Sequence, residues 1–482
     1  MIGHRPRRPG VRGVLHRITR PFVFLVLLLT LVGGSELSAA IATEFLSAQE
    51  AELGRLLNAE RTARGLPGLA NSAALRTVAR RHAQRMMTEG TIFHNERLRE
   101  DVEAVFPAWA SIGENVGYGP SVPRVHEAFL ASPAHRANIL DPDWGWVGIG
   151  VVSGGSRLFM TQNFLALQSG APRPAPAQFR LSGASRTATA RSLADFGFTP
   201  GSAAGAVVAD AFDFHGALAG AALAGQLGGP IVLTGREGMD ADALAAIVRA
   251  LGTARGKTVH LVGGPFDPSV RAAVEATGAT VRAIGGGDHV RTAADAARQL
   301  PRRPTSAFLT TVDDYPDALA ASALAARTGT PVLYTGRDAL SPDTAAVIRE
   351  LGIGRVDIVG GEGAVGTGVE RALRDAGVTV RRIAGPSRVE TALAVADHGL
   401  GLGLGPDHIL LATASNFPDA LAGGALSSQL RSPVLLTSGD RLHPAVASWL
   451  RNRRGSVDAV YLLGGTAALA GRIEQDVDAA LR

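Results

Sequence analysis

VDDYPDALAA, residues 312–321, has two related copies in the same chain, AFDFHGALAG at 211–220 and ASNFPDALAG at 414–423. Each copy lies between two apolar runs, as expected for short buried strands joined by helical segments. The copies are about 100 residues apart, whereas solenoid repeats recur every ~20–50 residues. The spacing therefore predicts three small domains in tandem.

The apolar runs around these copies give the fold class. Strands alternating with helical stretches predict a parallel sheet with helices on both faces, so we expect three α/β domains. The first predicted strands are Gly205–Ala209, Ser306–Thr311 and His408–Thr413, and the second are Pro230–Thr234, Pro331–Thr335 and Pro433–Thr437. A third run in each copy ends in Gly-Gly, at 260–264, 357–361 and 461–465. The predicted domains are 179–281, 282–381 and 382–482.

One glycine pattern in the second copy resembles a dinucleotide-binding turn. Gly361, Gly363 and Gly366 satisfy G-x-G-x-x-G directly after a predicted strand. The equivalent stretches, GGPFDP at 263–268 and GGTAAL at 464–469, lack this spacing. The shared Gly-Gly pair therefore indicates a tight strand-to-helix turn and not a nucleotide site.

With these motifs, residues 179–482 resemble the cell wall-binding repeat type 2 family. Its units begin with Arg-x-x-Thr-Ala and carry a Phe-Pro-Asp-Ala-Leu segment. Arg186 and Arg388 match the first motif, and Asp317 and Asp419 match the second. Two positions depart from the pattern: His289 stands in place of arginine, and His215-Gly216 stands in place of Pro-Asp.

The resemblance implies three Rossmann- or Toprim-like units packed around a pseudo-threefold axis. Such units hold secreted proteins to Gram-positive walls through anionic wall polymers or peptidoglycan. Arg186, Arg388, Asp317 and Asp419 are then the candidate wall-binding residues. The alternative is that the two aspartates only cap helices. Three repeats within one chain can satisfy one another, so we expect a monomer.

The N-terminus is typical of an export signal. Residues 1–40 combine six arginines, the short apolar run Phe22–Val32 and a small-residue exit, which predicts a secretory signal peptide. The run is shorter than the ~20 residues that span a bilayer, although an uncleaved anchor stays open. These 40 residues carry six of the 48 Lys and Arg and one of the 43 Asp and Glu, so the remainder is neutral. We therefore expect membrane contact only during export and no nucleic-acid partner.

Residues 44–167 form a separate predicted domain. Helices are expected at 44–65, 72–89 and 123–131, and strands at 146–152 and 158–165, with a loop-rich stretch after residue 90. Three prolines in residues 168–178 predict a semi-rigid, solvated linker. The chain has no cysteine, which excludes disulfides and thiol chemistry.

Five motifs in order within 46–166 resemble the bacterial branch of the CAP superfamily of cysteine-rich secretory and pathogenesis-related proteins. The motifs are FHN at 93–95, GENV at 113–116, SPAHRANIL at 132–140, VGIGV at 147–151 and TQNF at 161–164. The resemblance implies an α-β-α sandwich with a groove lined by His94, Glu114 and His135, supported by Asn115 and Ser132. The nearest acid before the second histidine is Glu127, whose spacing does not fit the family's second glutamate.

Two histidines and a carboxylate are a usual ligand set for zinc, with water in the fourth position. His135 lies in the first turn of a predicted helix, whose positive end disfavours its protonation. The alternative is a hydrogen-bonded cluster without metal. Ser132 precedes Pro133 at the helix start, which is typical of an N-cap, and no G-x-S-x-G elbow is present. A serine triad is therefore not expected.

The sequence thus indicates a secreted, wall-associated protein that displays a CAP domain. Whether that domain catalyses a reaction is left open. The alternative function is a metal-dependent, peptidase-like extracellular hydrolase acting at the wall.

Overall fold

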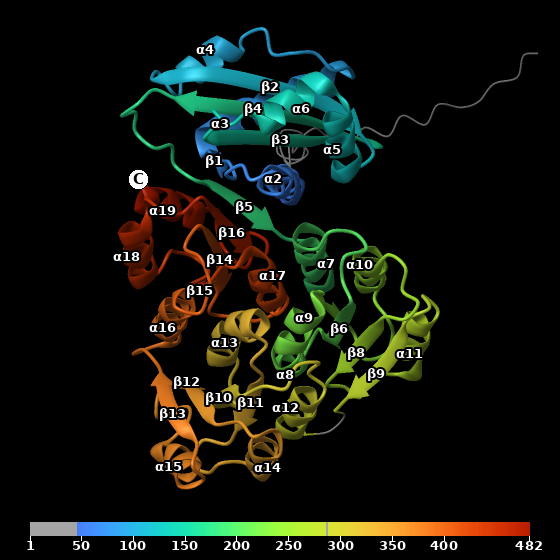
Figure 1. The fold of residues 1–482 in the computed structure, drawn as a ribbon, viewed down its shortest axis with the longest axis vertical. Helices are drawn as coiled ribbons and strands as arrows, with labels where there is room; N and C mark the ends of the chain where they lie inside the picture. The colour runs from blue at the N-terminus through green and yellow to red at the C-terminus, as the bar shows by residue number, and fades with distance from the viewer. Residues whose placement is uncertain (1–45, 286–287) are drawn as a thin grey trace, which may run out of the picture. The chain divides into compact units, whose positions relative to one another are not determined.

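The structure, a computed structural model, describes residues 46–285 and 288–482 (Figure 1). The predicted signal peptide, 1–40, lies outside the described residues. Within those ranges, the helices are too short or too polar to cross a membrane.

The N-terminal domain contains one four-stranded sheet in the order β1-β3-β4-β2. β4 pairs antiparallel with both β3 and β2, while β1 runs parallel to β3. The elements are α2 (Ser47–Thr62), β1 (Ala70–Asn71), α3 (Ala73–Glu89), α4 (Leu98–Glu103), β2 (Trp109–Gly119), α5 (Val122–Ala131), α6 (Pro133–Leu140), β3 (Trp146–Gly154) and β4 (Arg157–Leu167).

Helices cover both faces of this sheet, which confirms the predicted α-β-α sandwich. Apolar side chains of α2, α5 and α6 share one buried cluster with alternate residues of β3, such as Ile149. The other face of β3 meets α3 so closely that a Cβ at Gly148 would lie 2.2 Å from the Leu75 carbonyl carbon. The glycines of VGIGV are therefore required by helix-on-sheet packing.

One prediction for this domain is wrong. The stretch expected to be loop-rich contains α4 and the long strand β2. β2 carries three glycines where a buried strand usually shows apolar side chains. A Cβ at Gly117 would lie 2.9 Å from the Phe129 ring, so α5 fills the space that side chains would occupy. The apolar alternation is consequently absent from the sequence.

The C-terminal region contains three four-stranded parallel sheets, as predicted. The first repeat comprises α7 (Arg186–Gly197), β6 (Gly205–Asp210), α8 (Phe214–Ala219), α9 (Ala221–Leu227), β7 (Ile231–Thr234), α10 (Ala241–Leu251), β8 (Thr258–Val262), α11 (Pro268–Glu275) and β9 (Thr280–Ile284). The second comprises α12 (His289–Arg298), β10 (Ser306–Thr311), α13 (Pro316–Thr328), β11 (Val332–Thr335), α14 (Pro342–Leu351), β12 (Arg355–Val359), α15 (Thr367–Asp375) and β13 (Thr379–Ile383). The third comprises α16 (Arg388–Leu400), β14 (His408–Thr413), α17 (Gly423–Leu430), β15 (Val434–Thr437), α18 (Pro444–Arg453), β16 (Ala459–Leu463) and α19 (Gly471–Leu481).

The fourth strand of the third sheet comes from the start of the region. β5 (Ala177–Leu181) pairs parallel with β16, in the order β15-β14-β16-β5. The predicted solvated linker, 168–178, therefore runs into a buried strand, and its Pro174 and Pro176 are buried. The open edge of β16 explains the difference, because pairing with β5 satisfies backbone groups that water would otherwise solvate.

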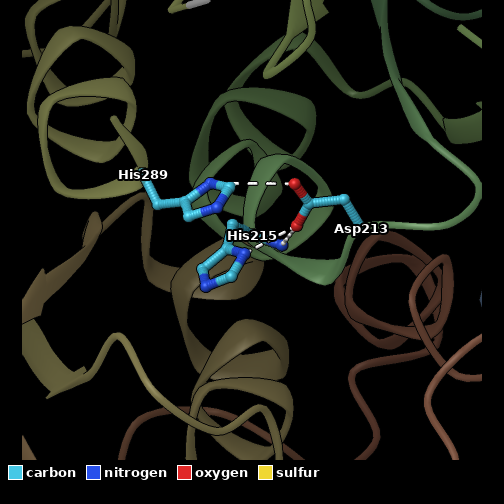
Figure 2. Close-up of side chains that lie close together, drawn as sticks. All are labelled: Asp213, His215 and His289. Carbon is cyan, nitrogen blue, oxygen red and sulfur yellow. Dashed lines mark hydrogen bonds and ion pairs between the residues drawn. The ribbon is translucent and has the colours of Figure 1, made fainter. Parts of the chain in front are cut away.

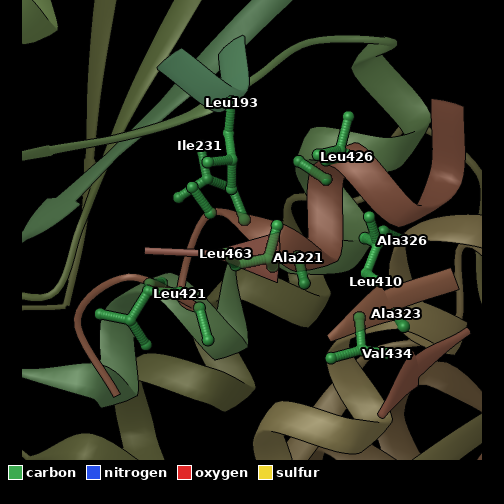
Figure 3. Close-up of a cluster of buried hydrophobic side chains, with 14 of the residues drawn as sticks. Leu193, Ala221, Ile231, Ala323, Ala326, Leu410, Leu421, Leu426, Val434 and Leu463 are labelled. Carbon is green, nitrogen blue, oxygen red and sulfur yellow. The ribbon is translucent and has the colours of Figure 1, made fainter. Parts of the chain in front are cut away.

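The three repeats share one large apolar core, in which Leu193 of the first repeat, Ala326 of the second and Leu426 of the third all take part (Figure 3). The second repeat also has a smaller core of its own. Small residues let their helices approach closely. A Cβ at Gly225 in α9 would lie 1.9 Å from the carbonyl oxygen of Ala326 in α13, and one at Gly424 in α17 would lie 2.7 Å from Ser322 Oγ. The repeats are thus pieces of one body.

Equivalent aromatic residues of the three repeats also meet one another. Phe214, Tyr315 and Phe417 hold the same position in the repeated segments, and their ring centroids are 5.4 to 5.8 Å apart. A trio of equivalent residues in mutual contact is what an arrangement around a pseudo-threefold axis produces. Edge-on aromatic contacts of this kind add about 0.5–1.5 kcal/mol each beyond burial.

The close helix contact leads to a stability prediction. Gly225→Ala should lower the free energy of unfolding of the repeat region by about 1–3 kcal/mol, because the new methyl group meets backbone. Helix propensity alone would change stability in the opposite direction. Gly471→Ala, at an exposed helix position with open space around it, is the matched control. Thermal and urea unfolding measure both variants, and equal stability of the two would contradict the steric reading.

Candidate functional site

The candidate site of the N-terminal domain is built around Glu114 on β2. Its side chain is only 4% exposed. Oε2 accepts hydrogen bonds from His94 Nδ1 and from the backbone N–H of Asn95, both at 2.9 Å. Oε1 is buried without a hydrogen-bond partner in the described part of the chain. A carboxylate oxygen so placed is available to a proton, a cation or a bound donor.

His94 completes the pair from the loop between α3 and α4. Its side chain is 67% exposed, in contrast to the buried carboxylate. Because a carboxylate only accepts hydrogen bonds, the proton of this bond is assigned to Nδ1. The imidazole is thus oriented by a buried acid and presented at the surface.

His135 lies in the first turn of α6, as predicted, with its ring centroid 5.1 Å from that of Phe129. Burial lowers its pKa, and the neighbouring His94 lowers the pKa further. The neutral state predicted for His135 agrees with this direction. The first cause is desolvation by the surrounding domain, which adds to the effect expected from the helix end.

A carboxamide network holds α6 against β2. Asn115 Nδ2 donates to the His135 carbonyl at 3.1 Å, and Asn138 Nδ2 donates to Asn115 Oδ1 at 2.9 Å and to the Glu114 carbonyl at 3.1 Å. Asn115, predicted as a supporting residue, therefore links the strand of Glu114 to the helix of His135. The fully buried Arg61 adds two bonds, to the carbonyls of Ile139 and Asp141 at the end of α6.

Ser132 occupies the N-cap position of α6, as predicted, without a side-chain capping bond. Glu127 points to solvent and pairs with Arg124, in line with its poor fit to the family's second acid. Sequence reasoning missed His82, a fully buried histidine on α3 whose Nε2 lies 3.9 Å from Glu114 Oε1. The signal was its position on the buried face of α3, between Val78 and Met86.

A zinc site requires converging ligands, which the three groove residues do not supply. Ligands about 2.0–2.1 Å from one zinc ion must lie within about 4 Å of one another. His94 and Glu114 meet this condition, but His135 does not join them. Within the described ranges, one trio of His and Asp side chains has all its ligand atoms within 4.8 Å, and it comprises Asp213, His215 and His289. As they stand, the groove residues do not form a converged ligand set.

In the repeats, the capping interpretation of Asp317 and Asp419 is wrong. The N-cap of α13 is Tyr315, and α17 begins only at Gly423, beyond Asp419. Both carboxylates instead lie against the first glycine of a Gly-Gly pair. A Cβ at Gly360 would lie 2.4 Å from Asp317 Oδ2, and one at Gly464 would lie 2.5 Å from Asp419 Oδ2. The glycine and the aspartate are therefore one structural unit, and the nucleotide reading of Gly361, Gly363 and Gly366 gains no support.

Both aspartates are held in surroundings that disfavour their charge. Burial raises the pKa of Asp317 to about 6, with Asp314 raising it further and Arg388 lowering it. Burial also raises the pKa of Asp419, while the hydrogen bond from the Thr189 hydroxyl and the charge of Arg186 lower it. Each aspartate is thus opposed by the arginine that begins the next repeat around the axis.

The two arginines hold equivalent positions. Arg186 Nη1 donates to the Ala211 carbonyl at 2.7 Å, and Arg388 Nη1 donates to the Ala414 carbonyl at 3.1 Å. Arg388 also pairs with Asp314 of the second repeat at 3.2 Å. The two carbonyl bonds lie within one repeat, at the ends of β6 and β14, and the Arg388–Asp314 pair joins the third repeat to the second.

A pocket of about 520 Å³ opens at this edge of the first sheet, lined by Asp210, Phe212 and the segment 235–238. Phe212 is 70% exposed, and the Arg186 guanidinium lies 4.4 Å from its ring centroid. Carboxyl ends of parallel strands are where α/β sheets bind ligands. Sequence reasoning identified Arg186 but not the aromatic ring beside it.

Comparison with known proteins agrees with this arrangement. The family Cell wall binding domain 2 (CWB2) matches residues 180–268, 283–370 and 382–474, and the Cysteine-rich secretory protein family, CAP, matches residues 55–164. Together the three repeats make up more than half of the chain.

Among curated proteins, N-acetylmuramoyl-L-alanine amidase LytC of Bacillus subtilis is 27% identical over 194 residues, 40% of this chain and 38% of that one. The uncharacterised protein YkwD of the same organism is 31% identical over 129 residues, 26% of this chain and 49% of that one. The chain thus spans less than half the length of either relative. Among solved structures, Cwp8 from Clostridium difficile has a TM-score of 0.58 at 21% identity, over 86% of this chain and 68% of that one, which supports the shared fold.

The tandem sheets, their shared core and the family matches together show that this chain belongs to the cell wall binding domain 2 family and carries a CAP domain at its N-terminal side.

Proposed function

We propose that this protein is exported and held non-covalently at the cell wall, where its three repeats bind an anionic wall polymer and its CAP domain is displayed. The observation that carries the proposal is the Arg186 guanidinium stacked over the exposed ring of Phe212, a ring that also lines the pocket at the carboxyl end of β6. A guanidinium suits phosphate or carboxylate groups, and an exposed aromatic face suits the apolar face of a sugar ring.

The arrangement of the repeats supports a polymer in preference to a small ligand. Equivalent segments follow β6, β10 and β14, so related surfaces recur around one body. A chain with repeating anionic units can engage more than one of them, and linked contacts raise the overall affinity without any single contact being strong. Two of the three arginine positions are filled, by Arg186 and Arg388, so the repeats are not equivalent binders.

A hydrolase is the second candidate function, favoured by the pair of His94 and Glu114. A surface imidazole held by a buried carboxylate is an arrangement that can accept a proton from an attacking water. Zinc at His94, Glu114 and His135 stays a prediction, because His135 does not converge with this pair. The display reading needs the same groove without a reacting water.

The wall-binding proposal predicts that the chain without residues 1–40 co-sediments with Gram-positive sacculi that carry their polymers. Arg186→Gln combined with Phe212→Ala should weaken retention about tenfold, equivalent to ~1.4 kcal/mol. Arg291→Gln, which removes a 71% exposed arginine away from the pocket, is the matched control. Equal retention on polymer-stripped sacculi would exclude an anionic polymer as the ligand.

The hydrolase alternative predicts that the protein releases soluble fragments from purified sacculi. His94→Ala should then reduce the rate by about 100-fold or more, as removal of a general base does. Glu114→Gln keeps the shape of the pair but removes the buried charge, and should reduce the rate as well. His408→Asn, far from the groove in sequence and position, serves as the control. No release above background from the unaltered protein would leave display as the function.

Asp317 gives a pH prediction. Because burial raises its pKa from 3.8 to about 6, the folded chain binds this proton more tightly than the unfolded chain does. Its contribution to the free energy of unfolding is therefore largest below about pH 4 and declines as the pH rises to about 6. Asp317→Asn should be more stable than the unaltered protein at pH 7, by about 1–2 kcal/mol after allowance for partial exposure.

Thermal unfolding at pH 4, 5, 6 and 7 measures this effect. Asp338→Asn, at a side chain that is 90% exposed, is the control and should change little. Lower stability of Asp317→Asn at pH 7 would show that the carboxylate has a partner that the buried position conceals.

A further inference from the structure

We propose that Asp213, His215 and His289 form a binding site for a divalent metal ion of the zinc class at the junction of the first and second repeats. Figure 2 shows the three side chains converging, Asp213 and His215 from the first repeat and His289 from the start of α12 in the second. Their ligand atoms all lie within 4.8 Å of one another. The site is separate from the groove, and it adjoins the pocket beside Phe212 through Arg236, which lines that pocket and donates to Asp213 Oδ2.

His289 stands at the position where the other two junctions have an arginine, Arg186 or Arg388. Arg388 bonds the Ala414 carbonyl and pairs with Asp314, whereas the equivalent His289 is too short to do both. His289 keeps the contact with the equivalent aspartate, Asp213, at 3.7 Å. His215 takes over the other contact, and its Nε2 lies 2.8 Å from the Val312 carbonyl. The two departures from the family pattern are therefore one rearrangement.

The hydrogen bonds of His215 leave a place for a cation. Nε2 faces a carbonyl oxygen at 2.8 Å, and Nδ1 faces Asp213 Oδ1 at 2.6 Å. Both partners accept hydrogen bonds, and a neutral imidazole has only one N–H to donate. With Nε2–H on Val312, the Nδ1 lone pair points at a carboxylate. Either a second proton on the ring or a metal ion on Nδ1 satisfies both partners, and with the metal the carbonyl bond fixes the ring in the way that second-shell partners orient metal-bound histidines.

The geometry and charge of the trio suit zinc. Two tetrahedral ligands at about 2.0–2.1 Å from zinc are about 3.3 Å apart, which is close to the 3.7 Å between His289 Nδ1 and Asp213 Oδ2. The two imidazole rings stack in parallel, with centroids 3.6 Å apart and planes 7° apart. Two stacked imidazolium rings would repel each other, so at least one ring is neutral and able to bind a metal.

Further donors hold the Asp213 carboxylate in place. The backbone N–H of His215 donates to Asp213 Oδ1 at 3.0 Å. Arg236 Nη2 also donates to Asp213 Oδ2, at 3.3 Å. Since Arg236 also pairs through Nε with the buried Asp210 and is half exposed, it can keep that partner when a metal takes Oδ2.

The test uses the chain without residues 1–40, free of any histidine tag and stripped with a chelator. Titration with zinc chloride, followed by calorimetry and thermal unfolding, should show about one equivalent bound at this site and a rise in melting temperature. His289→Arg restores the residue that the other junctions carry, so it should fold, and it should lose this equivalent and the rise. His215→Gln keeps a donor toward Val312 and should lose both as well.

Two further variants locate the metal. His135→Ala removes the groove histidine and should leave zinc binding at the junction unchanged. Arg388→His places a histidine opposite Asp314 but without a second one, because Pro316 stands at the position of His215, so it should gain no zinc site. Zinc uptake by His289→Arg equal to that of the unaltered protein, or loss of zinc only in His135→Ala, would overturn the proposal. Absence of zinc uptake by the unaltered protein would overturn it too.

Discussion

The close approach of α9, α13 and α17 is the constraint on which the C-terminal region depends. The backbone of Ala326 occupies the space where a Cβ of Gly225 would lie, and the side chain of Ser322 does the same at Gly424, so the three helices fit only as a set. This contact buries the alanine-rich faces of all three repeats in one core. β5 returns to β16 to complete the third sheet. The residues that begin each repeat are consequently held against the repeat before it, which is how every candidate wall-binding residue comes to lie at a junction.

The sequence predicts strands well where a buried strand is a continuous apolar run. It predicts them poorly where glycines let a neighbouring element fill the space of side chains. Strands such as β10 and β14 were predicted to the residue because parallel strands covered on both faces are continuously apolar. β2 was missed because the ring of Phe129 fills the place of a side chain at Gly117. The groove residues His94 and Glu114 were identified from the family resemblance, and they do meet. His82 was not identified, because its position on the buried face of α3 is equally that of an ordinary core residue.

Contacts between repeats lie beyond what the sequence pattern can predict. His215 and His289 were recognised as two separate departures, one in each of two repeats. That they stack at 3.6 Å depends on the rotation between the repeats, which no local periodicity encodes. The surroundings of Asp317 and Asp419 likewise depend on contacts between residues far apart in the sequence. A helix start predicts a cap, but the carboxylate is drawn to a glycine that follows a strand some 40 residues later in the chain, Gly360 for Asp317.

His215, Gly216 and His289 all differ from the residues at the equivalent positions of the other repeats. Together they explain why the junction of the first and second repeats differs from the other two junctions. Where Asp317 and Asp419 stand, the first repeat has Gly216, and a Cβ there would lie 2.4 Å from the Val262 carbonyl oxygen. Arg388 faces Asp317, and Arg186 faces Asp419. Because the first repeat has Gly216 at the equivalent position, an arginine at 289 would face Asp213 alone. A histidine pair satisfies Asp213 and Val312 with less positive charge than an arginine and a histidine together. The first junction is thus electrostatically distinct from the other two, and imidazole nitrogens facing a carboxylate give it a ligand chemistry that guanidinium groups cannot supply.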